Sequence, residues 1–269
     1  LSPNDSGSSV HLAVSGLKVR SDLAHGVNLT DISLEVRAGE VLGIAGIAGN
    51  GQIELMGALS GETGSPLAGA IRILGTNAIG LNPTARRSLG AVFVPEERIG
   101  HAAVADMTLV DNSYLTGDTR MNFSHRGLID WPAVTRFTQK VVQNFDVRTT
   151  GVDALASSLS GGNLQKFIVG REILQQPSLL VVSQPTWGVD AGAAAAIHEE
   201  IQRLVSAGAA VLMISQDLDE VFLLSHRIAV ISQGTLSVTT PIDEVSPEDI
   251  GLLMGVRHEV QPKVDHVAA

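Results

Sequence analysis

The chain of 269 residues contains no cysteine and no long apolar run. Without cysteine it can form neither a disulfide framework nor a thiolate metal site, which fits a cytoplasmic protein. No apolar stretch approaches the roughly 18 residues that a membrane-spanning helix needs, and the chain does not open on a charged-then-apolar signal segment. We therefore expect a soluble protein, and we interpret the polar, turn-rich residues 1–9 as a linker from something longer.

Basic residues are also scarce, since 18 Lys and Arg stand against 28 Asp and Glu, for a formal net charge of −10. Binding to a nucleic-acid backbone needs clustered Lys and Arg, so this composition argues against a nucleic-acid partner. It does not argue against a nucleotide, because a P-loop holds phosphate mainly through backbone N–H groups. Hydrophobic residues make up 44% and charged residues 17%, a balance typical of a packed globular core and not of a disordered chain.

Segments typical of strands alternate with segments typical of helices. Alternating apolar residues predict strands at 11–19 and 29–36, and short apolar runs predict further strands at 41–45, 70–74, 89–94, 179–182, 209–214 and 228–232. Helices are predicted at 52–59, 131–145, 164–174, 191–206, 217–224 and 250–254. Two of these have start signals, which are Pro132 in a first turn and capping-box spacing at 246–249. Because residues 99–158 read as helical but less regular, we predict an α/β fold with an inserted helical lobe.

A glycine-rich segment, Gly46–Ile53, lies between a predicted strand and a predicted helix. Gly46 and Gly51 have the spacing of the motif G-x-x-x-x-G-K-[ST], in which backbone N–H groups cradle phosphate, the lysine reaches the outer phosphates and the hydroxyl binds Mg²⁺. Here Gln52 stands in the place of the lysine and Ile53 in the place of the hydroxyl residue. Taken alone, the segment is more typical of a glycine-rich packing turn.

A second glycine segment changes this interpretation. Leu159–Gln165 begins 108 residues after Gly51 and opens a predicted helix, and a serine with two glycines at a helix N-terminus makes a good anion site. The segment resembles the LSGGQ signature of ATP-binding-cassette (ABC) proteins, with Asn163 in the final position. In dimers of that family, the signature holds the γ-phosphate of ATP bound to the opposite domain.

Three further segments stand in the order and spacing of an ABC cassette. Leu179–Thr186 resembles the Walker B strand, whose usual ending is Asp-Glu-Pro-Thr, and residues 187–190 follow where the D-loop belongs. Residues 214–220 resemble the switch segment, with Gln216 where a histidine is usual. Residues 94–98 stand at the Q-loop position, with Glu96 as the counterpart of its glutamine.

This resemblance covers nearly the whole chain, from about Val10 to Gly255. It implies the P-loop NTPase fold of an ABC cassette, with a mixed sheet in its core. The implied domains are a RecA-like nucleotide-binding core with a β-subdomain at 10–98 and 165–240, a helical signature subdomain at 99–164, and a C-terminal helix and tail at 241–269.

A narrower resemblance is carried by three short motifs. Gly-Asn-Gly-Gln at 49–52, Pro-Glu-Glu-Arg at 95–98 and Leu-Ser-Gly-Gly-Asn at 159–163 are similar to the second, C-terminal cassette of tandem ATPase subunits of bacterial simple-sugar and nucleoside importers. In that family one polypeptide carries two cassettes, and the second often has an altered catalytic site. The Gln-Pro-Thr ending at 184–186 resembles the nucleoside branch more than the ribose or galactose branch. The resemblance implies a first cassette, membrane permease subunits and, indirectly, a solute-binding protein as partners, and a location on the inner face of the cell membrane.

The substitutions predict that this P-loop does not hydrolyse ATP. Hydrolysis needs the phosphate charge neutralised, Mg²⁺ held, and a water aligned and deprotonated. Gln52 carries no charge and Ile53 cannot ligate Mg²⁺. Ser183 replaces a metal-supporting carboxylate, and Gln184 has the shape of glutamate but cannot accept a proton. We therefore assign no catalytic residue and no metal ligand, and Mg²⁺ binding stays open.

ATP binding is a separate question, and we expect it to be weak or absent outside an assembled complex. The backbone cradle can survive the loss of the lysine. However, the base-stacking aromatic residue expected upstream is not evident, because residues 21–26 offer only His25. That histidine either stacks on adenine or is an exposed loop histidine.

The signature half of the site is intact and can complete a composite site with a competent partner cassette, which would supply the lysine, the Mg²⁺ ligands and the base. The predicted nucleotide-site residues are Gly46, Gly49, Asn50, Gly51, Gln52, Ile53, Glu96, Ser160, Gly161, Gly162, Asn163, Gln165, Ser183, Gln184, Asp190 and Gln216.

Several interpretations keep an alternative. Asp190 supports the interface between cassettes or caps a helix, and Trp187 is an interface contact or a partly buried structural tryptophan. The acidic pair Glu96–Glu97 beside Arg98 belongs to a Q-loop or is a solvated turn. For the whole chain, the alternatives are an ATPase active in its own right and a regulatory or structural interaction module that no longer binds nucleotide. The lost Lys, Asp and Glu argue against the first, and the retained signature argues against the second.

Overall fold

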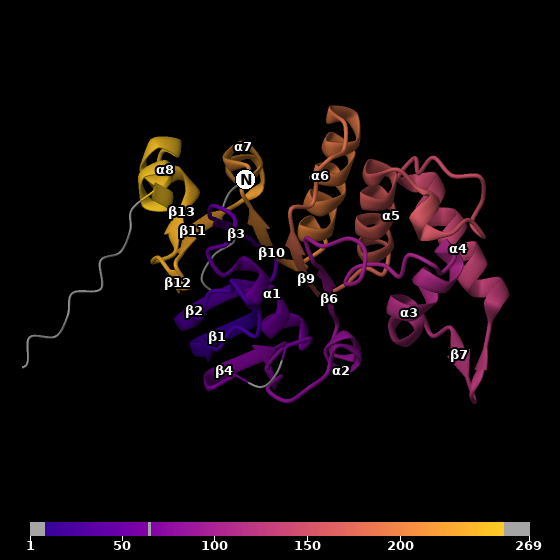
Figure 1. The fold of residues 1–269 in the computed structure, drawn as a ribbon, viewed down its shortest axis with the longest axis horizontal. Helices are drawn as coiled ribbons and strands as arrows, with labels where there is room; N and C mark the ends of the chain where they lie inside the picture. The colour runs from indigo at the N-terminus through magenta and orange to yellow at the C-terminus, as the bar shows by residue number, and fades with distance from the viewer. Residues whose placement is uncertain (1–8, 64–65, 256–269) are drawn as a thin grey trace, which may run out of the picture.

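The computed structural model describes residues 9–63 and 66–255, so residues 1–8 of the predicted linker at 1–9 and residues 256–269 of the predicted C-terminal helix and tail at 241–269 lie outside the described residues. A central seven-stranded sheet, a four-stranded antiparallel sheet and a small two-stranded hairpin form the β-structure (Figure 1). The strands are β1 Val10–Val19, β2 Leu29–Arg37, β3 Val41–Ala45, β4 Ala68–Ile73, β5 Thr76–Asn77, β6 Ala91–Val94, β7 Ser124–His125, β8 Leu128–Ile129, β9 Leu179–Ser183, β10 Ala210–Ser215, β11 Arg227–Ser232, β12 Thr235–Leu236 and β13 Thr240–Pro241.

The central sheet has the order β12-β11-β3-β10-β9-β6, and β13 pairs with β11. Every residue of β3, β9 and β10 is buried, as expected for strands that are covered on both faces. The strands from β11 to β6 run parallel, so their carboxyl ends share one edge. Ser215 pairs with Ala45, and Ile214 with Ser183. The segments that follow β3, β9 and β10 therefore emerge side by side, where ligands bind in open α/β sheets.

Eight α-helices lie within the described ranges, with short 3-10 helices at Ala156–Ser158 and Ile242–Glu244. The α-helices are α1 Gln52–Ser60, α2 Pro83–Ser88, α3 Leu109–Met121, α4 Trp131–Asn144, α5 Gly161–Ile173, α6 Ala191–Ser206, α7 Leu218–Leu224 and α8 Pro247–Gly255. Within these ranges no helix is both long and apolar enough to cross a membrane. In Figure 1, α3, α4 and the β7–β8 hairpin lie at the opposite end of the molecule from β12 and α8.

Two hydrophobic clusters fill the space between the layers, one on each face of the central sheet. One joins the antiparallel sheet and α1 to one face of the central sheet. The other joins the opposite face to α3–α7. The α/β fold with an inserted helical lobe is thus confirmed, but the predicted boundary after residue 164 falls inside α5, which continues unbroken to Ile173. The sequence patterns also missed α2, which begins at a side-chain cap from Asn82, and the β7–β8 hairpin within the predicted helical block.

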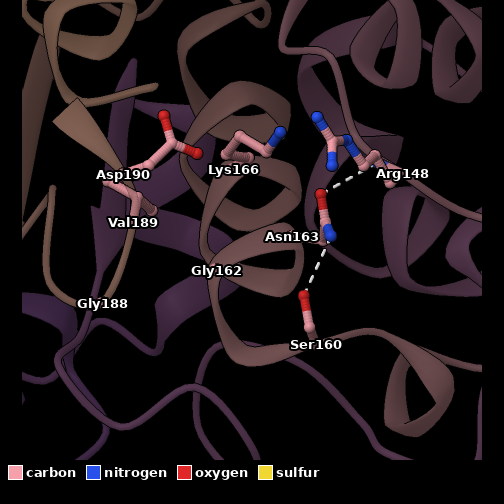
Figure 2. A pocket seen from close by; sticks show the side chains of 8 residues that line it. All are labelled: Arg148, Ser160, Gly162, Asn163, Lys166, Gly188, Val189 and Asp190. Carbon is pink, nitrogen blue, oxygen red and sulfur yellow. Dashed lines mark hydrogen bonds between the residues drawn. The ribbon is translucent and has the colours of Figure 1, made fainter. Parts of the chain in front are cut away.

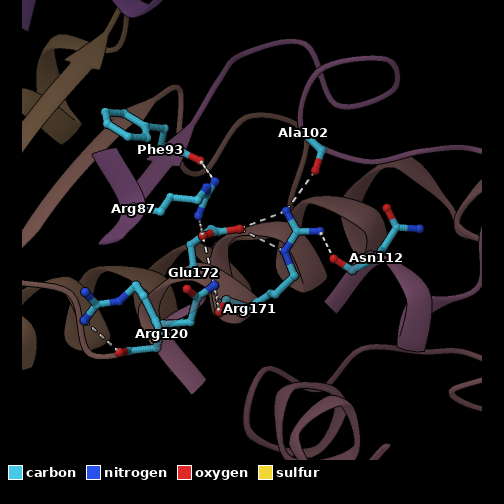
Figure 3. Close-up of polar contacts among 8 residues, drawn as sticks. Arg87, Phe93, Ala102, Asn112, Arg120, Arg171 and Glu172 are labelled. Carbon is cyan, nitrogen blue, oxygen red and sulfur yellow. Dashed lines mark hydrogen bonds and ion pairs between the residues drawn. The ribbon is translucent and has the colours of Figure 1, made fainter. Parts of the chain in front are cut away.

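A buried charged cluster fastens α5 to both the core and the helical lobe (Figure 3). Arg171 is 1% exposed, and its guanidinium donates to Oε1 of Glu172 at 2.9 Å and to the carbonyl oxygens of Ala102 and Asn112 at 2.8 and 3.1 Å. Oε2 of Glu172 accepts a bond from Arg87 at 2.6 Å. Burial opposes ionisation of Glu172, but Arg87 and Arg171 outweigh it and hold the pKa of this carboxyl below its ordinary value.

The imidazole of His226 makes one contribution to stability that depends on pH. Its Nδ1 accepts a hydrogen bond from the N–H of Val41 at 3.1 Å, which requires the neutral ring. Burial lowers the pKa of His226 from 6.5, and the nearby carboxylate of Glu40 only partly offsets this. The folded state then binds fewer protons than the unfolded state, so this contribution is complete above about pH 6.5 and is lost as the pH falls below it.

We therefore expect thermal stability to fall between pH 7.5 and 5.5, and we expect His226→Asn to flatten this part of the profile. Asn keeps an acceptor for Val41 but does not titrate. Midpoints of unfolding measured across this range test the expectation. A variant whose profile parallels that of the wild type would show that other groups cause the fall.

Candidate functional site

The P-loop segment connects β3 directly to α1. Gly49 and Gly51 adopt φ values of 80° and 110°, which glycine reaches without strain. Gly51 is the N-cap of α1, and its carbonyl accepts the first helical hydrogen bond from Leu55 N–H at 2.9 Å. The predicted order of strand, glycine loop and helix is confirmed.

Side chains of the loop itself close it by hydrogen bonds. The backbone N–H of Asn50 donates to Oε1 of Gln52 at 2.9 Å, and Nε2 of Gln52 donates to the carbonyl of Ile47 at 2.8 Å. Nδ2 of Asn50 donates to the same carbonyl at 2.8 Å. Gln52 is only 5% exposed, so its amide lies within the loop and not in solvent.

The turn between β11 and β12 holds the loop from outside. The N–H of Gln233 donates to Oδ1 of Asn50 at 2.8 Å, and the N–H of Gly234 donates to the Asn50 carbonyl at 2.9 Å. A Cβ on Gly234 would lie 1.9 Å from the carbonyl oxygen of Asn28, so this close approach requires glycine. Asn50 therefore fixes the position of the P-loop through both its side chain and its backbone.

The strand ends bring three further predicted residues to the same edge. Ser183 and Gln184 are buried, and Gln216 is exposed. Gln184 adopts a φ of 53°, and its Oε1 lies 3.4 Å from the N–H of Gln216. Ile53 projects into solvent with 58% of its surface exposed. At the positions where the sequence patterns place phosphate and metal ligands, the side chains are thus neutral.

A cavity of about 440 Å³ lies beside these residues and is lined in part by Gln52, Ile53, Ser183 and Trp187. Burial raises the pKa of Glu96, which also lines it. Its remaining charged or titratable lining residues are Arg20, Asp22, Glu54, Glu62, Glu97 and His101. Carboxylates therefore outnumber cations in the wall of this cavity.

The signature loop is ordered by Asn163 (Figure 2). Its Nδ2 donates to Oγ of Ser160 at 2.9 Å, and its Oδ1 accepts from the N–H of Arg148 at 2.9 Å. Ser160 is the N-cap residue of α5, but its side chain makes no capping bond. Because Oγ of Ser160 accepts from Asn163, its hydroxyl proton is free to point toward the exposed side of the loop. Asn163 thus acts by orienting Ser160.

A separate cavity of about 280 Å³ opens at the signature loop and includes Arg148, Ser160, Lys166 and Asp190 in its wall. No residue lines both this cavity and the one beside the P-loop. Only glycine fits at Gly162, since a Cβ there would lie 2.8 Å from the carbonyl of Gly188. Gly161 is exposed, and its position is less constrained, because a Cβ there would meet only the guanidinium of Arg98, at 2.7 Å, and that side chain can move.

Arg98 links the Q-loop segment to the signature helix and to the residues after β9. Its Nε donates to Oε1 of Gln165 at 2.9 Å, and its guanidinium donates to the carbonyl of Trp187 at 2.5 Å. Nε2 of Gln165 donates to the carbonyls of Gln184 and Pro185 at 3.1 and 3.0 Å. Gln165 is 3% exposed and lines neither cavity. It supports the site by connecting Arg98 to the backbone after β9.

The structure bears on three of the alternatives that the sequence leaves open. Asp190 caps α6 by accepting a bond from Ala193 N–H at 3.0 Å, and this bond lowers the pKa of its carboxyl. Trp187 is 59% exposed and lies against the guanidinium of Arg98, 4.9 Å from its ring centre. The interpretation of Trp187 as a partly buried structural residue is therefore wrong. His25 is exposed, as the loop interpretation predicts.

Sequence reasoning missed the role of Glu220. This buried carboxylate accepts bonds from the hydroxyls of Thr186 and Ser215, both at 2.7 Å, and lies 3.0 Å from Nε2 of His198. It therefore ties the ends of β9 and β10 to α6 and α7. Its only sequence signal was its place in the segment 214–220, where spacing drew attention to Gln216 instead.

The fold and the order of these segments define a nucleotide-binding cassette of the ABC class. The chain superposes on the structure of an ATP-binding subunit of an ABC transporter with a TM-score of 0.73, at 19% identity, covering 90% of this chain and 98% of that one. It also superposes on a nucleotide-free ATP-binding cassette from an ABC transporter with a TM-score of 0.70, at 20% identity, covering 92% and 100% of the two chains.

Residues 29–187 match the family model described as ABC transporter, and the chain belongs to this family. It is 39% identical over 223 residues to the nucleoside import ATP-binding protein NupA of Lactococcus lactis, covering 83% of this chain and 44% of that protein. It is 36% identical over 244 residues to the guanosine import ATP-binding protein NupO of Bacillus subtilis, covering 90% and 47%. The ribose import ATP-binding protein RbsA 1 of Streptomyces avermitilis is 34% identical over 258 residues, covering 96% and 48%. The chain spans about half the length of these relatives.

Proposed function

We propose that this chain is a cassette of an importer for nucleosides or sugars, that its own P-loop does not hydrolyse ATP, and that its signature completes the ATP site of a partner cassette. The observation that carries the proposal is the separation of the two cavities, which share no lining residue. A signature loop whose cavity shares no lining residue with the cavity beside its own P-loop is available to another domain. Arg148 and Lys166 add positive charge to that opening, which favours a phosphate from outside.

The side chains at the motif positions 53, 183 and 184 do not fit Mg²⁺ or a hydrolytic reaction. Mg²⁺ is held by oxygen ligands, chiefly carboxylates and phosphates. Ile53 offers no oxygen atom, and Ser183 is a buried hydroxyl in place of a carboxylate. Gln184 cannot serve as a base. We therefore propose no step of hydrolysis at this P-loop.

The partner cassette is proposed from the length of the relatives. The chain covers 44–48% of NupA, NupO and RbsA 1, so each of them has room for a second cassette of similar size. We propose that this chain is the second of two, as the motifs at 49–52, 95–98 and 159–163 indicate.

The permease subunits are proposed to contact the Q-loop segment at 94–98 and the helical lobe. Ile99, Val104 and Met107, which follow the Q-loop segment, are exposed apolar side chains, and exposed apolar patches mark interaction surfaces. We extend the helical lobe to the end of α5 at Ile173, since a helix moves as one piece. A solute-binding protein and a location on the inner face of the membrane follow from this assembly.

The alternative, an interaction module without nucleotide, has one observation in its favour. The P-loop of this chain is closed by Gln52, which makes its bonds within the loop. The alternative of an interaction module does not explain why Asn163 orders Ser160, or why Ser160 lines an open cavity. The proposed function accounts for both the closed P-loop and the open signature cavity.

The purified chain is expected to show no ATP turnover above that of a mock purification. The variant Gln184→Glu is also expected to show none, because a base alone restores neither phosphate neutralisation nor a metal ligand. A coupled phosphate-release assay measures this. Turnover that follows the chain through successive purification steps, and that is unchanged in Gln184→Glu, would contradict the proposal.

A further inference from the structure

We propose that this P-loop is occupied by the protein's own side chains, with the Gln52 amide in the phosphate cradle and the Glu54 carboxylate at the helix N-terminus, so that nucleotide phosphate is excluded. The inference rests on the proposed function in one respect, since it explains how a P-loop that takes no part in hydrolysis stays folded without a nucleotide.

Gln52 uses one of the backbone N–H groups that a P-loop offers to phosphate, that of Asn50. Backbone N–H groups of such loops point inward at phosphate oxygens. Here the Asn50 N–H donates to Oε1 of Gln52, and Nε2 of Gln52 binds the Ile47 carbonyl across the loop. A Cβ on Gly46 would lie 2.8 Å from Nε2 of Gln52, so the amide packs against the first glycine as well. The carbonyl oxygen of Gln52 takes the place of a phosphate oxygen.

Glu54 supplies the negative charge. It stands in the first turn of α1 and is 7% exposed, and a carboxylate at a helix N-terminus interacts favourably with the helix dipole. Its Oε1 accepts bonds from the hydroxyl of Ser21 at 2.9 Å and from the N–H of Val27 at 2.8 Å. A phosphate approaching α1 would meet this charge, and like charges repel.

The same contacts draw the segment 21–27 over the loop. A Cβ on Gly26 would lie 2.5 Å from Oε1 of Glu54, so the backbone approaches the carboxylate closely. The space left between His25, Gly49 and Ile53 is about 170 Å³, and it adjoins the cavity of about 440 Å³ that Gln52, Ile53 and Glu54 also line. Gln52 thus occupies the phosphate site, and we call it the plug. Glu54 holds the segment 21–27 beside the loop, and we call it the latch.

If Gln52 occupies the phosphate site, removing its side chain is expected to increase the affinity of the chain for ATP. Admitting phosphate to the wild-type loop requires breaking both hydrogen bonds of Gln52, whereas Gln52→Ala leaves the Asn50 N–H free. We expect Gln52→Ala to bind ATP about tenfold more tightly than the wild type, although no lysine is restored. Glu54→Thr removes the repelling charge and the latch, and is expected to increase affinity on its own.

The experiment is calorimetric titration of the purified chain with ATP and, separately, with pyrophosphate. Gln139→Ala is the matched control, because Gln139 lies on an exposed position of α4; it is expected to bind as the wild type does. If Gln52→Ala does not fold, as judged by circular dichroism, Glu54→Thr carries the test. Affinity in both variants no higher than in the wild type would overturn the inference.

The two proposals fail in different ways. A wild-type chain that binds ATP as tightly as Gln52→Ala, without turnover, overturns the plug and leaves the proposed function standing. A Gln52→Ala chain that gains binding and also hydrolyses ATP supports the plug and overturns the claim that this site lacks the means of hydrolysis.

Discussion

Replacing Glu172 by alanine is expected to lower the free energy of unfolding by about 3–5 kcal/mol, because it leaves buried guanidinium groups without their counter-charge. Arg171 is fully buried beside Glu172, and Arg87 donates to the same carboxylate. Arg120 lies close enough for the charges of Arg87 and Glu172 to act on it. One carboxylate thus neutralises several cations, and among the residues that the structure describes no other acidic side chain pairs with them.

Urea unfolding followed by circular dichroism measures this effect. The control is Glu200→Ala, which removes a partly exposed ion pair with Arg203 on α6 and is expected to cost no more than about 1 kcal/mol. Equal losses in the two variants would contradict the structural role of the cluster. Since the cluster joins α5 to the core and to the loop at Ala102, its loss is also expected to loosen the signature helix.

Ser160→Arg is expected to reduce ATP hydrolysis by the assembled importer about 10²–10³-fold, the usual effect of removing one oriented donor from a reacting phosphoryl or acyl group. The hydroxyl of Ser160 is oriented by Asn163 and opens into the cavity of about 280 Å³. An arginine side chain would fill that cavity and displace the partner's phosphate. The effect is expected at the partner's site, although the substitution lies in this chain.

The control for this variant is Ser157→Arg. Ser157 is an exposed serine of the short helix before the signature and does not line the cavity. It is expected to leave hydrolysis unchanged. Unchanged hydrolysis and transport in Ser160→Arg would favour the alternative of an interaction module.

Much of the fold could be predicted from the sequence, because short buried strands and capped helices have local signals. The apolar run at Val41–Ala45 and the caps at Asp190 and Asp217 are examples. The β7–β8 hairpin was not predictable, since its turn residues, Arg126 and Gly127, both adopt positive φ values, and arginine does not mark such a turn as asparagine would.

The candidate site was predictable as an order of motifs but not as a set of contacts. Spacing placed Gln52 in the lysine position without showing that its amide turns back into the loop. The bond from Arg98 to Trp187 spans 89 residues, and no periodicity reports such a contact. Asn163 and Gln165 were predicted as nucleotide-site residues. Asn163 lines the signature cavity and bonds to Ser160, and Gln165 bonds to the backbone after β9.

The central claim is that this cassette gives its signature to a partner while its own P-loop stays out of the reaction. The most direct test is the number of ATP molecules bound by the assembled pair of cassettes, measured with radiolabelled ATP when hydrolysis at the partner's site is blocked. The account predicts one ATP for each pair, held between the partner's P-loop and Ser160 of this chain. Two ATP molecules for each pair would contradict it.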